Sequence, residues 1–284
     1  MAVAEHPTAL ELPHLDLLWA APGALGPATD PVTEAYGGTP LFPSPHDGHP
    51  AVVANFVSTL DGVVSYATPE AAGGGEISGF FATDRFVMAL LRSHADAVLI
   101  GAGTVRAAPD ERWTAADVYP HAADAFAAIR RAHELPPQPG TVVMTSSGDL
   151  DPAHPGLSDP EIPVVVAHAA ETADRQFAPN VERLRVSGVA DLLTSLHARG
   201  MRLVLCEGGP HLMAELLHEG SVDELFLTVA PQIAGRSGDR RRLALVEGLA
   251  FDVADAPWWE LRTIHRAGQH LFLRYAHNPT TRGD

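Results

Sequence analysis

The hydrophobic positions of the chain follow two alternating periods from residue 50 onward. Short apolar runs that are rich in β-branched residues are typical of buried strands. These runs lie at 51–62, 96–104, 140–148, 162–169, 203–206 and 222–235. Between them, apolar residues spaced three or four positions apart predict helices at 83–95, 122–135, 189–200 and 210–217. Strands that alternate with helices indicate an α/β fold with a mainly parallel sheet flanked by helices.

The two ends of the chain break this alternation. Residues 258–277 read as two strands joined at Ala267-Gly268, which predicts a C-terminal antiparallel hairpin that adds edge strands to the sheet. Residues 1–48 are rich in proline and glycine, so we expect a mostly irregular N-terminal extension with one short helix at about 9–20.

The pattern contains no internal repeat and no second block of strands and helices. A chain of 284 residues can bury a sizeable core in one domain. We therefore expect an extension at 1–48, a single α/β domain at 49–278 and a short tail at 279–284.

Composition and charge narrow the class of protein. Hydrophobic residues make up 46% of the chain, as in ordinary globular proteins, and no apolar run approaches the roughly 18–20 residues of a membrane helix. The first residues lack the basic and apolar blocks of a secretory signal, so we expect a cytoplasmic protein. The formal net charge of −16 repels nucleic acid and anionic membranes, which leaves small molecules as the expected ligands.

Cysteine and histidine usage argues against several kinds of site. Cys206 is the only cysteine, so the chain has no internal disulfide and no multi-cysteine metal site, and its apolar surroundings predict a buried, unreactive thiol. The 15 histidines form no H-E-x-x-H motif, and the sequence has no G-x-S-x-G motif. We therefore expect neither a metal centre nor a serine hydrolase.

A first glycine-rich turn follows the strand predicted at 96–104. In "LIGAGTVR", Gly101 and Gly103 would let a ligand approach the backbone, and Thr104 stands where a helix or turn begins. The pattern G-x-G-x-x-R lacks the third glycine of the dinucleotide fingerprint, so an ordinary glycine-rich connection explains it as well.

A second turn of this kind, "CEGGPHL", follows the strand predicted at 203–206. Gly208 and Gly209 free the backbone, and Pro210 suits the first position of a helix whose amides would form an anion site. Glu207 stands at the carboxyl end of the strand, where ligands gather in open α/β sheets. Two glycine-rich helix starts on one parallel sheet predict a diphosphate held between them.

Three further polar positions have two interpretations each. Ser146 lies in "VVMTSSG", whose hydroxyls would either bind a ribose or a 2′-phosphate or cap the turn. Asp61 forms an Asp-Gly pair, which is most often only a turn. Arg92 closes an apolar helix face and would either lie on the surface or reach an anionic substrate.

Four segments, taken in order along the chain, resemble one known family. They are "NFVSTLDG", "LLRSHADAVLIGAGTVRAAP", "VVMTSS" followed by "LDP", and "CEGGPHLMAELLHEGSVDELFLTVAPQIAG". Together they are similar to the C-terminal reductase domain of the bifunctional riboflavin-biosynthesis deaminase–reductase. The resemblance implies a dihydrofolate reductase-like fold, a homodimer and NADPH as the cofactor. It also implies reduction of the ribosylamino group of 5-amino-6-(5-phosphoribosylamino)uracil, or a related phosphorylated aminopyrimidine, to the ribitylamino form.

The resemblance assigns roles to residues of this sequence. It implies catalytic roles for Asp61 and Glu207 and substrate contacts by Arg92, Glu207 and Ser78. The two turns and the family together give the expected cofactor contacts: Val57, Gly101, Gly103, Thr104, Ser146, Gly208, Gly209, Pro210, His211 and Leu212.

The sequence departs from the family on the substrate side. One cysteine cannot build the zinc signature of the deaminase half, H-x-E with P-C-x-x-C, so this chain does not contain that half. Where the riboflavin enzymes have an acid-rich stretch and then a substrate arginine, this chain has "RAAPDERW", with Asp110 and Arg112 out of register. Ser78 and Phe80 lie near a family serine and tryptophan. Two alternatives therefore stay open, namely a reductase of another acceptor such as a dihydropterin, and a non-catalytic nucleotide-binding scaffold protein.

Overall fold

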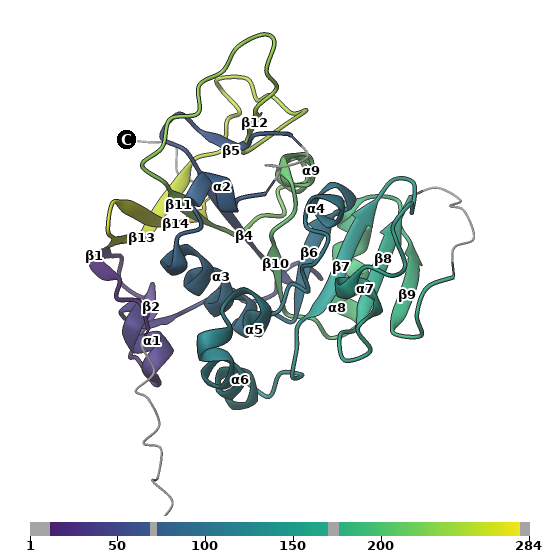
Figure 1. The fold of residues 1–284 in the computed structure, drawn as a ribbon, viewed down its shortest axis with the longest axis horizontal. Helices are drawn as coiled ribbons and strands as arrows, with labels where there is room; N and C mark the ends of the chain where they lie inside the picture. The colour runs from purple at the N-terminus through teal and green to yellow at the C-terminus, as the bar shows by residue number, and fades with distance from the viewer. Residues whose placement is uncertain (1–11, 69–72, 170–175, 279–284) are drawn as a thin grey trace, which may run out of the picture.

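A sheet of ten strands runs through the molecule (Figure 1). The structure, a computed structural model, describes residues 12–68, 73–169 and 176–278. In spatial order the strands are β1 (Asp16–Ala20), β13 (Trp259–Ala267), β14 (His270–His277), β11 (Glu224–Val229), β4 (Ala51–Ser58), β10 (Leu203–Cys206), β6 (Ala97–Gly101), β7 (Gly140–Thr145), β8 (Val164–His168) and β9 (Val181–Arg185).

The expected mainly parallel sheet is confirmed. Neighbouring strands from β11 to β9 are parallel, whereas β1, β13, β14 and β11 pair with one another in antiparallel order. The pair β13 and β14 forms the predicted C-terminal hairpin, and Gly268 in its turn has a φ of +56°. Glycine adopts this left-handed conformation without a steric cost, so a turn at this point is favoured.

Helices lie on both sides of the sheet. In chain order they are α1 (Pro31–Tyr36), α2 (Gly75–Ser78), α3 (Ala82–His94), α4 (Ala102–Ala107), α5 (Ala115–Val118), the 3₁₀ helix η1 (Pro120–Ala122), α6 (Ala123–Ala132), α7 (Pro155–Ser158), α8 (Val189–Ala198) and α9 (Pro210–His218). The four helices predicted from apolar spacing correspond to α3, α6, α8 and α9. Gly200 follows the cap of α8 with a φ of +86°, as expected where a helix ends on glycine.

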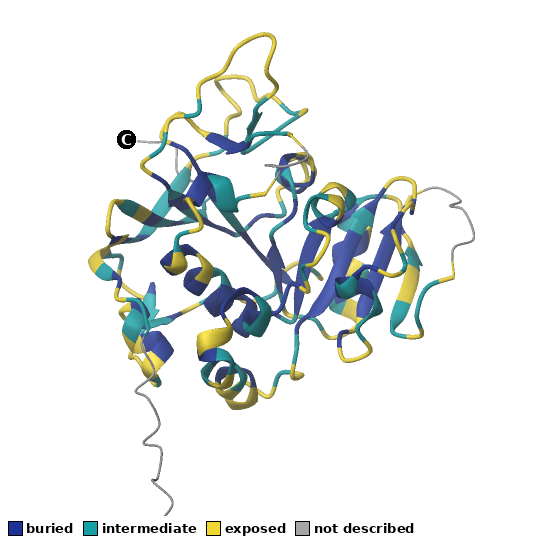
Figure 2. Ribbon diagram, viewed as in Figure 1, coloured by how far each residue is buried: buried dark blue, intermediate teal, exposed yellow. Residues whose placement is uncertain are grey.

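Each face of the central strands is covered by its own helices. Successive side chains of a strand point to opposite faces. In β6, Val98 and Ile100 pack in the same core as residues of α3 and α6, while Ala97 and Leu99 pack with residues of α8 and α9. Because both faces are covered, these strands are apolar at nearly every position and appear buried in Figure 2.

The N-terminal segment is more regular than its composition suggests. The helix expected at about 9–20 is wrong for residues 16–20, which form strand β1, and residues 9–11 lie outside the described residues. One edge of the sheet is therefore β1, and not the C-terminal hairpin. Two short strands, β2 (Leu25–Gly26) and β3 (Thr39–Pro40), pair with each other and flank α1. The expected tail at 279–284 also lies outside the described residues.

A buried ion pair fastens this segment to the sheet. Arg274 of β14 donates from Nε and Nη2 to Glu224 of β11, at 2.9 and 2.7 Å. Its Nη1 also donates to the carbonyl oxygen of Ala24 at 2.8 Å, and its Nη2 to that of Leu41. Buried charges need such complete pairing, so the N-terminal segment completes the core on this side of the sheet.

A further pair of short strands, β5 (Val63–Ser65) and β12 (Leu243–Ala244), is antiparallel. Within the described residues, no helix has the length and apolar character needed to cross a membrane. Among the residues that the structure describes, no three side chains of His, Cys, Asp or Glu lie close enough together to hold a metal ion.

Candidate active site

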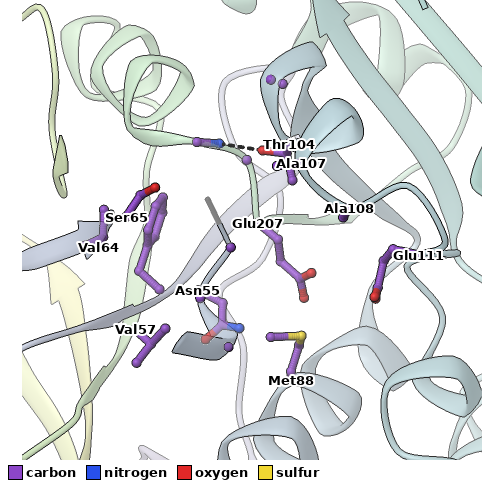
Figure 3. A pocket seen from close by; sticks show the side chains of 18 of the residues that line it. Asn55, Val57, Val64, Ser65, Met88, Thr104, Ala107, Ala108, Glu111 and Glu207 are labelled. Atoms are coloured by element: carbon purple, nitrogen blue, oxygen red, sulfur yellow. Dashed lines mark hydrogen bonds between the residues drawn. The ribbon is translucent and has the colours of Figure 1, made fainter. Parts of the chain in front are cut away.

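A cleft of about 1020 Å³ opens at the carboxyl ends of β4, β10 and β6. Its walls come from α3, α4, the segment 73–80 and the turn between β10 and α9 (Figure 3). Ligands collect at this edge of open α/β sheets, and the volume lies at the upper end of the range for small-molecule sites. Of the residues expected in the site, the cleft brings together Val57, Ser78, Arg92, Gly101, Gly103, Thr104, Glu207, Gly208, Gly209, Pro210, His211 and Leu212.

The glycines of the two turns serve different purposes. A Cβ atom on Gly101 or Gly103 would meet no atom within 4 Å, so these residues leave backbone open to the cleft. A Cβ atom on Gly208 would lie 2.6 Å from Cδ2 of Leu212 and 2.9 Å from the nitrogen of Gly101. Glycine is therefore required at position 208 because the two turns approach each other closely.

The N-terminus of α9 presents backbone amides to the cleft. Gly209 is the N-cap without a capping side chain, and Pro210 takes the first helical position, as predicted. The N–H of Gly209 donates to Oγ1 of Thr104 at 3.1 Å, which ties the two turns together (Figure 3). The amides of His211 and Leu212 belong to the first turn, where a helix provides no acceptor, and both residues line the cleft. An anion bound here would also meet the positive end of the helix dipole.

Glu207, which directly follows β10, is held by Arg92 of α3. Nη2 of Arg92 donates to Oε2 of Glu207 at 2.7 Å and Nε donates to Oε1 at 3.1 Å, so the pair is bidentate. Nη1 of Arg92 donates to Oε1 of Glu111 at 2.7 Å and to the carbonyl of Thr114 at 3.0 Å. Figure 3 shows the carboxylates of Glu207 and Glu111 in the cleft. Arg92 therefore carries a carboxylate on each side.

Burial disfavours the charged forms of Arg92 and Glu207, and their ion pair favours them. The exposed fraction of the side chain is 2% for Arg92 and 7% for Glu207, against 29% for Glu111. Burial favours a neutral Arg92, yet the two carboxylates outweigh it and raise its pKa above the ordinary value. Burial also raises the pKa of Glu207, and Arg92 counteracts that shift. The guanidinium is therefore a cation bound by two carboxylates of the protein, and its expected contact with a substrate stays a prediction.

The cleft contains another acid, Asp84, that the sequence analysis missed. Asp84, Met88 and Arg92 are spaced four residues apart, so they share one face of α3, and all three line the cleft. Only 8% of Asp84 is exposed, and this burial raises its pKa although the hydroxyls of Thr228 and Ser78 stabilise the carboxylate. The spacing was a usable signal, but an acid in the first turn of a helix usually marks only favourable dipole charge.

Two of the expected site residues do not line the cleft. The carboxylate of Asp61 accepts hydrogen bonds from the hydroxyl of Thr59 (2.6 Å) and from the amides of Ala234 (3.1 Å) and Gly235 (2.8 Å). These bonds lower the pKa of Asp61 to about 2, so it is an ionised anchor between two loops and is unsuited to donate a proton. Ser146 is exposed just after β7, beyond the strands that border the cleft.

The loop at 108–113 is where the sequence departs from the riboflavin enzymes. Arg112, the residue that stood out of register, does not line the cleft and pairs with Asp117 at 3.2 Å. Trp113, the last residue of the loop, is buried and has a φ of +54°. The loop directs Glu111 into the cleft, so an acid stands where a substrate arginine was sought.

Comparisons with known proteins identify the family of the chain. The family model for the RibD C-terminal domain matches residues 50–272. The chain belongs to this family. A 2,5-diamino-6-ribosylamino-4(3H)-pyrimidinone 5′-phosphate reductase of Methanothermobacter thermautotrophicus is 31% identical over 234 residues, which cover 80% of this chain and 97% of that protein.

Longer RibD proteins match this RibD C-terminal domain protein as well. The riboflavin biosynthesis protein RibD of Escherichia coli is 29% identical over 193 residues, covering 65% of this chain and 49% of RibD. The solved structure of Acinetobacter baumannii RibD superposes with a TM-score of 0.62 at 25% identity, over 82% of this chain and 59% of that one. The chain thus spans roughly half of these two RibD proteins, and both the resemblance and the fold class inferred from the sequence are confirmed.

Proposed function

We propose that this RibD C-terminal domain protein is an NADPH-dependent pyrimidine reductase of riboflavin biosynthesis. It would reduce 5-amino-6-(5-phosphoribosylamino)uracil, or a related aminopyrimidine, to the ribitylamino form. The observation that carries the proposal is the cleft, in which an open glycine turn and a helix N-terminus adjoin the buried Glu207–Arg92 pair. The likeness to the M. thermautotrophicus reductase over nearly the whole length of that protein supports it.

The residues at the strand ends fit a nicotinamide dinucleotide. The open backbone of Gly101 and Gly103 and the amides at the start of α9 would hold its diphosphate. The strands β4, β10, β6 and β7 follow one another, so Val57 and Ser146 stand about three strand spacings, or about 14 Å, apart across the sheet. A dinucleotide along this edge would extend from Val57 at the nicotinamide to Ser146 at the adenosine. When bound, this cofactor supplies the hydride.

Ser146 is the residue that favours NADPH over NADH. Of the neighbouring hydroxyls, Thr145 accepts from the amide of Gly148 at 3.1 Å and Ser147 accepts from the amide of Asp149 at 3.2 Å, so both cap the turn. Ser146 is exposed and has no hydrogen bond with another described residue. Its hydroxyl is therefore available to the 2′-phosphate that distinguishes NADPH.

Glu207, Asp84 and Asn55 would contact the acceptor. Reduction of the opened sugar imine adds a hydride to C1′ and a proton to the neighbouring nitrogen. The carboxylate of Glu207, which is paired with Arg92, would accept N–H or O–H groups of the acceptor. Asp84 has a raised pKa and no arginine partner among the described residues, so its carboxyl group, in place of Asp61, would carry the proton. The amide of Asn55, seen in Figure 3, both donates and accepts.

A reductase of another acceptor, such as a dihydropterin, is the second candidate. The observation that favours it is the loop at 108–113, which departs from the sequence of the riboflavin enzymes and places the acid Glu111 against Arg92. The cofactor edge is the same in both candidates. Only the acceptor that oxidises NADPH separates them.

A homodimer in the cytoplasm belongs to the same proposal. Leu17, Leu18 and Trp19 of the edge strand β1 are 40, 53 and 45% exposed, and an apolar strand edge favours pairing with a second copy. The buried, unpaired thiol of Cys206 suits a reducing compartment. Analytical ultracentrifugation should show a particle of twice the chain mass.

Cofactor titration followed by turnover tests the proposal. We expect NADPH to bind more tightly than NADH, and nicotinamide absorbance to fall only when the aminopyrimidine is added. Equal affinity for the two cofactors would remove Ser146 from the cofactor site. Binding of NADPH without turnover of any pyrimidine or pterin would favour a non-catalytic scaffold protein.

A further inference from the structure

Glu111 occupies the side of Arg92 that a substrate anion would need. A guanidinium has five N–H donors. Four of those of Arg92 are engaged: one from Nε and one from Nη2 with Glu207, and two from Nη1 with Glu111 and the Thr114 carbonyl. One N–H of Nη2 is left, so an anion could make a bidentate contact with Arg92 only by displacing a carboxylate.

Glu111 is the more readily displaced of the two carboxylates. Its contact with Arg92 is one ion pair through Oε1, whereas Glu207 holds Arg92 through both oxygens. Its side chain is 29% exposed, compared with 7% for Glu207. Glu111 also lies on the loop between α4 and α5, whereas Glu207 is fixed at the end of a central strand. Access to Arg92 is therefore controlled by Glu111.

The charges around the Arg92 end of the cleft also disfavour a bound phosphate. Of the five acids that line the cleft, Asp84, Glu111 and Glu207 interact with one another around Arg92. Arg92 is the buried cation among them, while Arg85 and Arg106, the other arginines of the described lining, are exposed to solvent. A phosphate placed beside Arg92 would meet more negative than positive charge, in surroundings where charges are poorly screened.

We infer that Glu111 is a specificity-determining residue that excludes phosphate from the Arg92 end of the cleft and reserves this end for an uncharged, hydrogen-bond-donating part of the acceptor. The inference rests on the proposed function and specifies its substrate. The N–H groups of an aminopyrimidine ring suit the acids of this end, whereas a phosphate group on the same molecule must lie elsewhere.

Binding of inorganic phosphate tests the inference without any turnover. We would titrate the wild type, Glu111→Gln and Asp110→Asn with phosphate by isothermal titration calorimetry. Glu111→Gln leaves Nη1 of Arg92 with at most a neutral acceptor, which a phosphate displaces more easily than a carboxylate, and removes one negative charge, so the phosphate affinity should rise roughly tenfold or more. Asp110→Asn removes the same charge from an exposed neighbour outside the cleft lining and should bind phosphate as the wild type does. The amides of α9 are identical in the three proteins, so a difference reports on Arg92.

Equal phosphate affinity of Glu111→Gln and the wild type would overturn the inference. Should the glutamine variant fold poorly, Glu111→Ala is the second variant, with the same expected gain and the same overturning result.

Turnover separates this inference from the proposed function. If no variant reduces an aminopyrimidine, the proposed function fails while the phosphate result still decides the role of Glu111. If the wild type reduces an aminopyrimidine, Glu111→Gln must lower the KM of a phosphorylated acceptor relative to that of its unphosphorylated counterpart. An equal change in both KM values would contradict the inference.

Discussion

Alanine substitutions at Gly101 and Gly208, which lie close together in space, should affect NADPH binding and protein stability differently. Gly101 has a φ of −87° and a ψ of 155°, which alanine adopts freely, and an added Cβ would meet no atom within 4 Å. We therefore expect Gly101→Ala to change the free energy of unfolding by no more than about 0.5 kcal/mol. The same methyl group would stand where the cofactor diphosphate approaches the backbone, so the Kd for NADPH should rise roughly tenfold or more.

The outcome at Gly208 should be different. There the added Cβ would lie 2.6 Å from Cδ2 of Leu212, 2.9 Å from the nitrogen of Gly101 and 3.0 Å from Cα of Ile100. Two of these atoms are backbone atoms of β6 that cannot turn aside, so the two turns must move apart. Overpacking of this kind costs about 1–3 kcal/mol. Gly208→Ala should lose that much stability, and NADPH should bind more weakly as a consequence of the displaced turns.

Urea unfolding and NADPH titration of the wild type and the two variants measure both effects. The two experiments together distinguish an open backbone from a crowded one. Unchanged NADPH affinity in Gly101→Ala would refute the cofactor path past Gly101. Wild-type stability in Gly208→Ala would show that the close approach of the two turns is not a constraint on the fold.

Three further predictions concern charge and protonation. Glu207→Gln should lower turnover about 10- to 100-fold with the Kd for NADPH unchanged, because a neutral amide binds acceptor N–H groups less strongly, and unchanged kinetics would remove Glu207 from the substrate site. Turnover should fall as the pH rises through the pKa of Asp84, which burial raises, and Asp84→Asn should be about 100-fold slower and lose this pH dependence. Stability should fall as the pH drops from 6.5 towards 4, because burial lowers the pKa values of His94 and His265 to about 4 and the unfolded chain then binds more protons. Each histidine accounts for about 3 kcal/mol of this loss, and urea unfolding that is flat across this pH window would contradict the buried, neutral state of both.

Local signals predicted the elements whose conformation depends on near neighbours. Gly200 ends α8, Pro210 begins α9 and Gly268 turns the hairpin, because the backbone preference of each residue acts within one turn of chain. Strand β1 could not be predicted in this way. Its residue Asp16 pairs with Arg266, which lies 250 positions later, and strand pairing of this kind overrides local propensity.

The same division applies to the cleft. The turn at Gly101 and the turn after Glu207 could be recognised because both contain glycines, whose backbone is conformationally permissive. The place of Glu111 depends on how the loop at 108–113 lies against α3, and that of Asp84 on how α3 lies against β11, and no local pattern records either. The opposite error occurred at Asp61, which the sequence placed in the site. Its carboxylate is instead bound by backbone amides more than 170 positions away in the chain, which no local pattern could show.

Transfer of deuterium from labelled NADPH to the acceptor tests the central claim most directly. The protein would be incubated with NADPH deuterated at C4 of the nicotinamide and with an aminopyrimidine that carries the ribosylamino group. Mass spectrometry and NMR of the product should place the deuterium at C1′ of a ribitylamino group. Recovery of the acceptor unreduced, although NADPH binds, or a product without deuterium at C1′, would contradict the assignment of this cleft to pyrimidine reduction.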